Sequence, residues 1–160
     1  MHTVIANRVI DVSLNRVWAV LDDFGNIYKY NPGVKSSTLL STTKSGIGAK
    51  RICHFYDGNS LKETITEYKD KQGYSFVLSD FKLPLKMAKT KILVRAKGEN
   101  ATQIQVVLSF QPKFGPLGWL MAKVLLKPAL KKAMKGLTKG LDDHIRSGQI
   151  VSQNGELETT

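Results

Sequence analysis

The chain has 160 residues, a net charge of +11, and a composition that is 42% hydrophobic and 23% charged. This length is typical of one domain large enough to bury a core and enclose a cavity, and the composition excludes fibrous and intrinsically disordered proteins. The charge leaves nucleic acid, anionic lipid and acidic ligands open as partners. The single cysteine, Cys53, excludes an intramolecular disulfide and favours a reducing, cytoplasmic location.

The N-terminal part predicts one strand followed by two short helices. Residues 4–12 are β-rich, and the start of the chain lacks the apolar core of a signal peptide. Ser13 stands where a helix N-cap belongs, and the apolar residues after it recur at helical spacing. The aromatic segment 24–30 predicts a second short helix, which the helix breakers at 31–33 end.

Residues 34–112 predict six strands joined as an antiparallel meander. Turn signals separate these strands at 44–46, 57–59, 71–73 and 98–100, together with a loop around Pro84. The last two strands show the clearest alternation, with apolar residues sharing one face over 88–96 and again over 102–110. Because only one face of such a sheet is polar, another element must cover the apolar face.

The covering element is predicted as a helix from Pro116 to about Arg146, where leucines recur at helical spacing. Pro128 should kink this helix, because proline lacks the N–H donor and clashes with the preceding turn. The apolar window 114–126 is interrupted by a lysine and is shorter than the ~20 residues that cross a bilayer. Residues 148–160 are polar and aperiodic, so we expect a disordered tail.

This order of one strand, two short helices, six strands and one long helix resembles the START/Bet v 1-like superfamily and its helix-grip fold, over residues 1–147. Three segments resemble its polyketide cyclase/dehydratase and lipid-transport group, namely 17–24 (VWAVLDDF), 46–51 (GIGAKR) and 57–63 (DGNSLKE). The resemblance implies an α+β domain with a curved seven-stranded antiparallel sheet wrapped around the long helix. Members range from lipid carriers to cyclases, so the likeness implies a cavity rather than one reaction.

Strand alternation places two charged residues, Arg51 and Glu63, on inward faces. Arg51 shares its side with Cys53, and Glu63 shares its side with Ile65. A three-residue loop at 57–59 would set Cys53 opposite Glu63 and Arg51 opposite Ile65, which leaves the two charges in diagonal reach. The pair then either anchors the polar end of a ligand in an apolar pocket or forms a structural ion pair.

Other candidate residues follow from the resemblance. Lys35 is similar in position to a pocket lysine of the plant hormone receptors, but the strand pattern at 35–38 does not separate inside from outside and favours a solvated surface lysine. The largely apolar loop 81–85 either acts as a lid over the cavity mouth or only caps the end of the barrel. The predicted ligand-binding set is Phe24, Tyr28, Tyr30, Lys35, Arg51, Cys53, Phe55, Glu63, Ile65, Tyr74, Phe76, Leu78, Leu83, Ile92, Val106, Leu108, Phe110, Leu117, Met121 and Val124.

No metal or cofactor is predicted. His2, His54 and His144 lack ligand spacing with one another. No serine stands in a Gly-x-Ser-x-Gly context, which disfavours a hydrolase. The pair Gly46 and Gly48 precedes no predicted helix and is therefore a hairpin signal rather than a phosphate-binding loop.

We therefore predict a protein that binds or transports a lipid-like or aromatic small molecule. The alternative is a polyketide cyclase or dehydratase, for which Arg51, Glu63, Tyr28 and Lys35 are the acid and base candidates. A second alternative is a basic protein that binds nucleic acid or an anionic membrane, although no nucleic-acid motif is present. Transient membrane contact is favoured by lysines that recur every fourth residue along the predicted helix, Lys123, Lys127, Lys131, Lys135 and Lys139.

Overall fold

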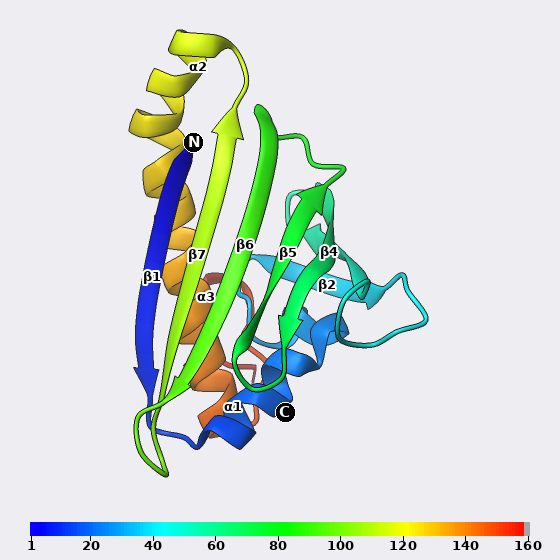
Figure 1. Ribbon diagram of the computed structural model, residues 1–160, viewed down its shortest axis with the longest axis vertical. Helices are drawn as coiled ribbons and strands as arrows, with labels where there is room; N and C mark the ends of the chain where they lie inside the picture. Colours follow the sequence, from blue (N-terminus) through cyan, green and yellow to red (C-terminus); the bar gives the residue numbers. More distant parts are fainter. Residues whose placement is uncertain (159–160) are drawn as a thin grey trace.

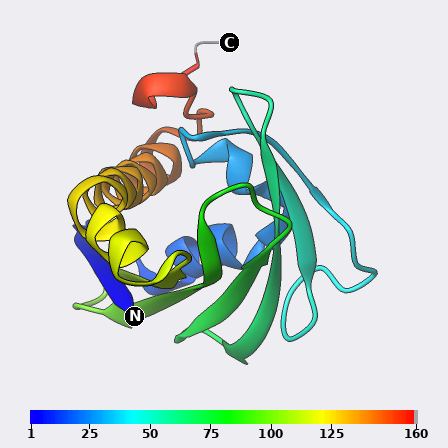
Figure 2. The same cartoon turned by 90° about the horizontal axis from the view of Figure 1, so that it is seen from above.

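In the computed structural model, which describes residues 1–158, one seven-stranded antiparallel sheet curves around a long C-terminal helix (Figure 1, Figure 2). The strands are β1 (His2–Ile10), β2 (Val34–Leu39), β3 (Lys50–Phe55), β4 (Ser60–Lys69), β5 (Gly73–Ser79), β6 (Leu85–Ala96) and β7 (Thr102–Pro112). Their order in the sheet is β1-β7-β6-β5-β4-β3-β2, so β1 pairs with β7 and the rest follow the chain as a meander. The predicted α+β helix-grip fold is confirmed.

Alternating side chains give the sheet one buried face. In β7, Ile104, Val106 and Phe110 are buried, whereas the glutamines at 103 and 105 are partly exposed. Antiparallel pairing with β1 sets Ala6 opposite Val106, and Ala6 is also buried. This is the pattern of a sheet covered on one side, and the long helix provides the cover.

Two short helices lie at the end of the sheet where β1 finishes (Figure 1). They are α1 (Leu14–Asp22) and the 3-10 helix η1 (Phe24–Lys29). Ser13 occupies the N-cap position of α1 as predicted, although its side chain makes no capping hydrogen bond. Trp18 Nε1 donates a hydrogen bond to Asp70 Oδ1 at 2.9 Å, which ties α1 to the turn between β4 and β5.

The long helix has three consecutive parts, α2 (Gly115–Met121), the π-helical turn η2 (Ala122–Leu126) and α3 (Lys127–Ser147). The predicted disturbance at Pro128 takes the form of this widened turn, in which the Lys127 N–H donates to the Ala122 carbonyl five residues earlier. Because proline has no N–H to donate, the wider turn carries the helix past the missing hydrogen bond. No helix within residues 1–158 is long and apolar enough to cross a membrane.

α3 is the part of the long helix that packs on the sheet. It buries Met134, Leu141 and Ile145. Its buried Asp142 accepts hydrogen bonds from Arg8 Nε at 2.7 Å and Arg146 Nε at 2.6 Å. A polar link therefore joins α3 to β1 beside the apolar contacts.

α2 and η2 extend past the ends of β1 and β7 (Figure 1). Among the described side chains of these two elements, Gly118 and Ala122 alone are buried. Gly118 lies so close to the end of β7 that an added Cβ would stand 1.6 Å from the Lys113 carbonyl oxygen. Glycine is therefore required where α2 turns back over the strand end.

The segment after α3 differs from the disordered tail that we expected. Val151 is buried, its N–H donates to the Lys29 carbonyl at 2.9 Å, and it forms a β-bridge with Leu157. The 3-10 turn η3 (Gln153–Gly155) lies inside this hairpin-like return. This segment is thus tied to η1 by the Val151–Lys29 hydrogen bond and by the buried Val151 side chain. Residues 159–160, also part of the predicted tail, lie outside the described residues.

Candidate functional site

Arg51 and Glu63 form a buried ion pair between β3 and β4. Both side chains point inward as predicted, with Arg51 0% and Glu63 8% exposed. The predicted register was wrong, because Arg51 lies directly opposite Glu63 and Cys53 lies opposite Leu61. The three-residue loop spans 56–58, one residue earlier than expected, and this shifts the pairing by two residues.

Two of the three guanidinium nitrogens of Arg51 have hydrogen-bond partners. Its Nε donates to Glu63 Oε2 at 2.5 Å, and its Nη1 donates to the Phe24 carbonyl at 2.6 Å. Its Cζ lies 3.7 Å from the centroid of the Phe24 ring and 5.2 Å from that of Phe76, which adds cation–π attraction. Burial acts to lower the pKa of Arg51, but the neighbouring Glu63 carboxylate outweighs it and holds that pKa above its ordinary value.

Two tyrosines and the cysteine complete this polar cluster. Tyr74 donates its hydroxyl to the Leu21 carbonyl at 3.1 Å. Burial raises the pKa of Tyr30 to about 12, and burial with the nearby Glu63 charge raises the pKa of Cys53 to about 12. Burial raises the pKa of Tyr74 as well. All three groups therefore stay protonated near neutral pH, so they offer no base or thiolate nucleophile there.

The interior around this cluster is filled. Among the buried side-chain atoms of the described residues, Tyr30 Oη and Arg51 Nη2 have no hydrogen-bond partner. Tyr30, Phe76 and Thr138 are among the residues around an enclosed space of only about 20 Å³, which is the size of one water molecule. The space enclosed by these residues has no room for a ligand.

Ligand-sized space lies instead at the open end of the sheet, under α2 and η2. This pocket, which we call the apical pocket, has a volume of about 360 Å³. Its lining residues are Pro84, Pro112, Lys113, Phe114, Gly118, Met121, Ala122, Leu125, Leu126 and Ala129. Lys113 is the one ionisable residue among these described residues, so the walls are almost wholly apolar.

A second space, the helix groove, runs along the other side of α3 and has a volume of about 670 Å³. It lies between α3, the turn at 31–33, the hairpin joining β3 to β4, and the C-terminal return. Its lining is more polar and includes Asp57, Lys132 and Asp143. Ala129 lies at the border and lines both spaces. Neither Arg51 nor Glu63 is among the described residues that line the apical pocket or the helix groove.

The predicted ligand-binding residues fall into three groups. Twelve are buried in the core: Phe24, Tyr30, Arg51, Cys53, Glu63, Ile65, Tyr74, Phe76, Ile92, Val106, Leu108 and Phe110. Tyr28, Phe55 and Leu78 are partly buried, and Lys35, Leu83, Leu117, Met121 and Val124 are exposed. Of the twenty, Phe55 lines the helix groove, Met121 lines the apical pocket, and Tyr74 lines a further space of about 830 Å³ formed by residues of β4, β5 and β6.

Three interior placements need correction. Leu117, Met121 and Val124 were expected to line the inside of the sheet, but their side chains are 66%, 52% and 60% exposed. The reason is that α2 and η2 extend past the strand ends, so little of the sheet lies opposite them. Lys35 is a solvent-facing residue of β2, which matches the alternative reading of that lysine.

Most residues of the apical pocket were missed. Gly118, Ala122, Leu125 and Ala129 recur at intervals of four, three and four residues, so they share one helix face. That spacing was readable in the sequence, but glycine and alanine carry no strong apolar signal. Pro84, in the loop expected to be a lid or a cap, also lines this pocket. No cluster of three or more His, Cys, Asp or Glu suited to a metal occurs within residues 1–158.

Comparisons with known proteins agree with this fold. The sequence profile of the family described as polyketide cyclase / dehydrase and lipid transport matches residues 1–146. No sequence among the curated proteins is significantly similar to this chain.

Several solved structures share the fold. XoxI from Bacillus cereus is 17% identical, with a TM-score of 0.77 over 92% of this chain and 97% of its own. A START superfamily protein from Mycobacterium smegmatis is 15% identical, with a TM-score of 0.74 over 91% and 98%. Norcoclaurine synthase from Thalictrum flavum, solved with a transition-state analogue, is 14% identical, with a TM-score of 0.69 over 92% and 95%. These likenesses show the fold, and with the match over 1–146 the chain belongs to the polyketide cyclase / dehydrase and lipid transport family.

Proposed function

We propose that the protein binds an apolar small molecule in the apical pocket and carries it. The observation that supports this is the pocket's combination of a volume of about 360 Å³ with walls of proline, leucine, methionine, alanine and phenylalanine. Small-molecule sites in proteins are of this size and are mostly apolar, with a few polar groups for orientation. Lys113, at the rim, is suited to orient a carboxylate or carbonyl at one end of the ligand.

Burial of the ligand supplies the affinity. A molecule that loses ~300 Å² of apolar surface to water-free walls gains about 7 kcal/mol before the cost of association. Lipid-like and aromatic molecules both meet this requirement, and the chemistry of the walls does not distinguish them. The family description includes lipid transport, which supports a carrier.

The buried ion pair takes the structural role in this proposal. Arg51 donates a hydrogen bond to Glu63, and its guanidinium lies against the rings of Phe24 and Phe76. A ligand could use them as an anchor only after the core had opened. We therefore assign orientation of the ligand to Lys113 rather than to Arg51.

The enzymatic alternative is a cyclase or dehydratase, as the family description and the norcoclaurine synthase likeness allow. Such chemistry needs an acid and a base within hydrogen-bond reach of the substrate. The described lining of the apical pocket offers Lys113 alone, and Glu63 is bound to Arg51 in the core. This scarcity of acid and base groups favours a carrier.

A carrier must collect its ligand from a donor, and the net charge of +11 favours an anionic membrane over a neutral surface. A cytoplasmic location is part of the same proposal. It is supported by Cys53, the single cysteine of the sequence, which rules out an intramolecular disulfide.

The proposal is tested with Nile red, a neutral apolar fluorophore, and with fatty acids as competitors. Ala129→Trp should fill part of the apical pocket and weaken probe binding at least about tenfold, a loss of ~1.4 kcal/mol. Ala133→Trp, one turn further along α3, touches the helix groove alone and should bind the probe as the unmodified protein does. Loss in both variants would place the ligand in the groove, and loss in neither would refute the apical site.

A second measurement separates carrier from enzyme. The protein is incubated with any co-purified ligand and with model poly-β-ketones, and the products are weighed by mass spectrometry. We expect every molecule to return unchanged. Loss of water or formation of a new ring, abolished by Glu63→Gln, would establish the cyclase instead.

A further inference from the structure

The outward side of α2 and η2 is an exposed apolar surface. Phe114 is 73% exposed and Leu125 is 64% exposed, and the neighbouring apolar side chains are about as open to solvent. We call this surface the apical patch, and its residues are Phe114, Leu117, Trp119, Leu120, Met121, Val124 and Leu125. Scattered apolar residues are normal on protein surfaces, but seven within twelve positions of one helical segment indicate a binding surface.

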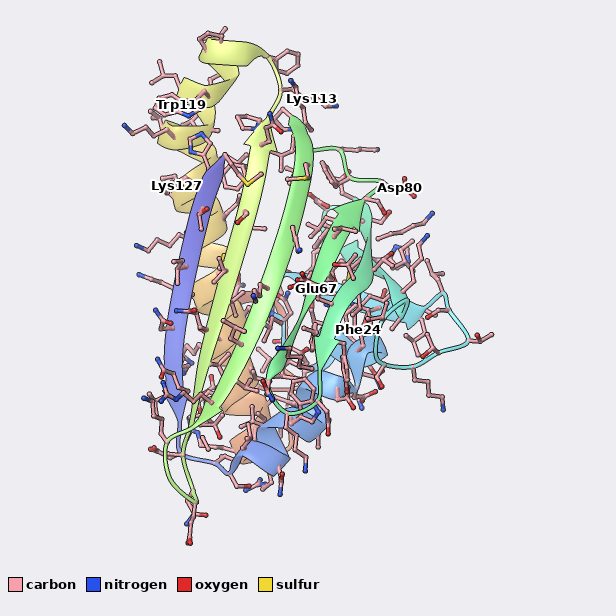
Figure 3. The ribbon with its side chains drawn as sticks, viewed as in Figure 1. Phe24, Glu67, Asp80, Lys113, Trp119 and Lys127 are labelled. Atoms are coloured by element: carbon pink, nitrogen blue, oxygen red, sulfur yellow. The ribbon has the colours of Figure 1, made fainter. Side chains whose placement is uncertain are left out.

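The charge around the apical patch has one sign. Residues 100–141 contain no Asp or Glu, and their lysines are Lys113, Lys123, Lys127, Lys131, Lys132, Lys135 and Lys139. Trp119 and Lys127 both lie near the start of β1 (Figure 3), where the Trp119 ring stands 5.4 Å from the His2 ring and remains 47% exposed. The Lys123 ammonium lies 5.4 Å from the centroid of the Trp119 ring. A tryptophan beside lysines is typical of residues at the boundary between lipid headgroups and acyl chains.

We propose that the apical patch docks on an anionic lipid bilayer, with its apolar side chains in the outer acyl region and its lysines among the headgroups. The charge excludes a second copy of this chain as the natural partner, because two lysine-rich surfaces repel each other. Nucleic acid would match the lysines but would leave Leu117, Leu120 and Val124 in water. An anionic bilayer satisfies both the apolar and the basic components.

The apical patch and the apical pocket are continuous. Phe114, Met121 and Leu125 belong to both, so the mouth of the pocket opens within the docking surface. A bound molecule would therefore pass between pocket and bilayer without crossing bulk water. This step rests on the proposed carrier function, whereas docking itself does not require a ligand.

Docking is tested by co-sedimentation with vesicles of phosphatidylcholine alone and of phosphatidylcholine with about 30% phosphatidylglycerol. We expect binding to the anionic vesicles and weaker binding to the neutral ones. Binding to the anionic vesicles should decrease at high salt, because salt screens the attraction between the lysines and the anionic lipids. Trp119, the exposed one of the two tryptophans, should shift its emission to the blue on docking, and Trp119→Phe should remove that shift. Equal binding to both vesicles, or to neither, would overturn the proposal.

Two pairs of variants locate the surface. Leu120→Glu with Val124→Glu should weaken vesicle binding at least about tenfold, whereas Ile5→Glu with Val9→Glu, comparably exposed on β1, should not. Lys123→Glu with Lys127→Glu should weaken it similarly. The same charge change at Lys44 and Lys97, exposed and remote in the fold, should have a smaller effect. Equal losses at the remote lysines would show attraction by net charge alone and would overturn the assigned surface.

Failure of docking is distinguishable from failure of ligand binding. Leu120 and Val124 are not among the residues that line the apical pocket, so Leu120→Glu with Val124→Glu should still bind Nile red in the absence of vesicles. A variant that loses both vesicle binding and Nile red binding would indicate that the helix has unfolded, which circular dichroism would reveal. The variant Lys123→Glu with Lys127→Glu would then decide whether this surface docks. Retained vesicle binding by both variants, or selective capture of a single-stranded oligonucleotide in preference to anionic vesicles, would overturn the proposal.

Discussion

The two ends of the long helix have similar residues but opposite surroundings. α3 buries Met134, Leu141 and Ile145 against the sheet. α2 and η2 carry as many large apolar side chains, yet they bury only Gly118 and Ala122 among their described residues. An apolar helix face is therefore buried only where the fold places another surface against it. Where the strands stop, the same kind of face remains available for a ligand or a bilayer.

The largest effect is expected from breaking the buried Arg51–Glu63 pair. Arg51→Ala removes one half of a buried pair and leaves the Glu63 carboxylate uncompensated, so the free energy of unfolding should fall by about 3–5 kcal/mol. Urea denaturation measures this loss. Replacing both residues together, Arg51→Met with Glu63→Leu, should recover much of the stability. A nearly silent Arg51→Ala would contradict the enclosed geometry described for this pair.

A backbone contact in the same region gives the next largest effect. A Cβ on Gly140 would lie 2.1 Å from the Tyr30 carbonyl oxygen, so Gly140→Ala should push α3 away from η1 and cost about 2–3 kcal/mol. Gly136, one turn earlier, is the matched control, because an added Cβ there would meet only Pro32 at an ordinary distance of 3.5 Å. Gly136→Ala should be neutral or stabilising by up to about 1 kcal/mol. Equal costs at both positions would refute the close approach.

Asp142 of α3 should make the stability of the protein sensitive to acid. Burial acts to raise the pKa of this carboxyl, but hydrogen bonds from Arg146 and Arg8 outweigh it and hold the pKa below its usual value. Its stabilisation is therefore present above the unfolded-state pKa of 3.8 and is lost as the pH falls through the folded-state value. Asp142→Asn should lower the free energy of unfolding by about 1–2 kcal/mol at neutral pH. It should also make that free energy depend less on pH in the acid range. Thermal unfolding of the variant and of the unmodified protein, from pH 7 downward, measures both effects. The same pH dependence in the two proteins would contradict the role given to Asp142.

The smallest effect is expected at the overhanging end. Leu120→Ser changes a side chain that is half exposed and should alter the free energy of unfolding by less than about 0.5 kcal/mol. The same substitution at Leu141, which is 2% exposed, should cost about 3 kcal/mol or more. Comparable losses at the two leucines would mean that α2 and η2 pack against something in solution, and light scattering would then show self-association.

Much of the fold could be predicted because it depends on local patterns. Alternation over 88–96 and 102–110 specifies strands with one buried face, and turn residues specify where the meander reverses. The inward direction of Arg51 and Glu63 followed from the same period of two residues. Their direct pairing did not, because a loop that begins one residue earlier shifts the cross-strand register by two, and the sequence of that turn allows both positions.

The location of the ligand-sized space was decided by tertiary structure alone. Side-chain identity says that Phe24, Tyr74 and Phe76 are large and apolar, but only their packing shows that they fill the interior instead of lining a cavity. The apical pocket, in turn, exists because helix and strands end at different heights, a property of lengths and angles that no single residue carries. The sequence alone determined which faces are apolar. The three-dimensional arrangement determined which of those faces are covered, since burial requires a partner surface from elsewhere in the chain.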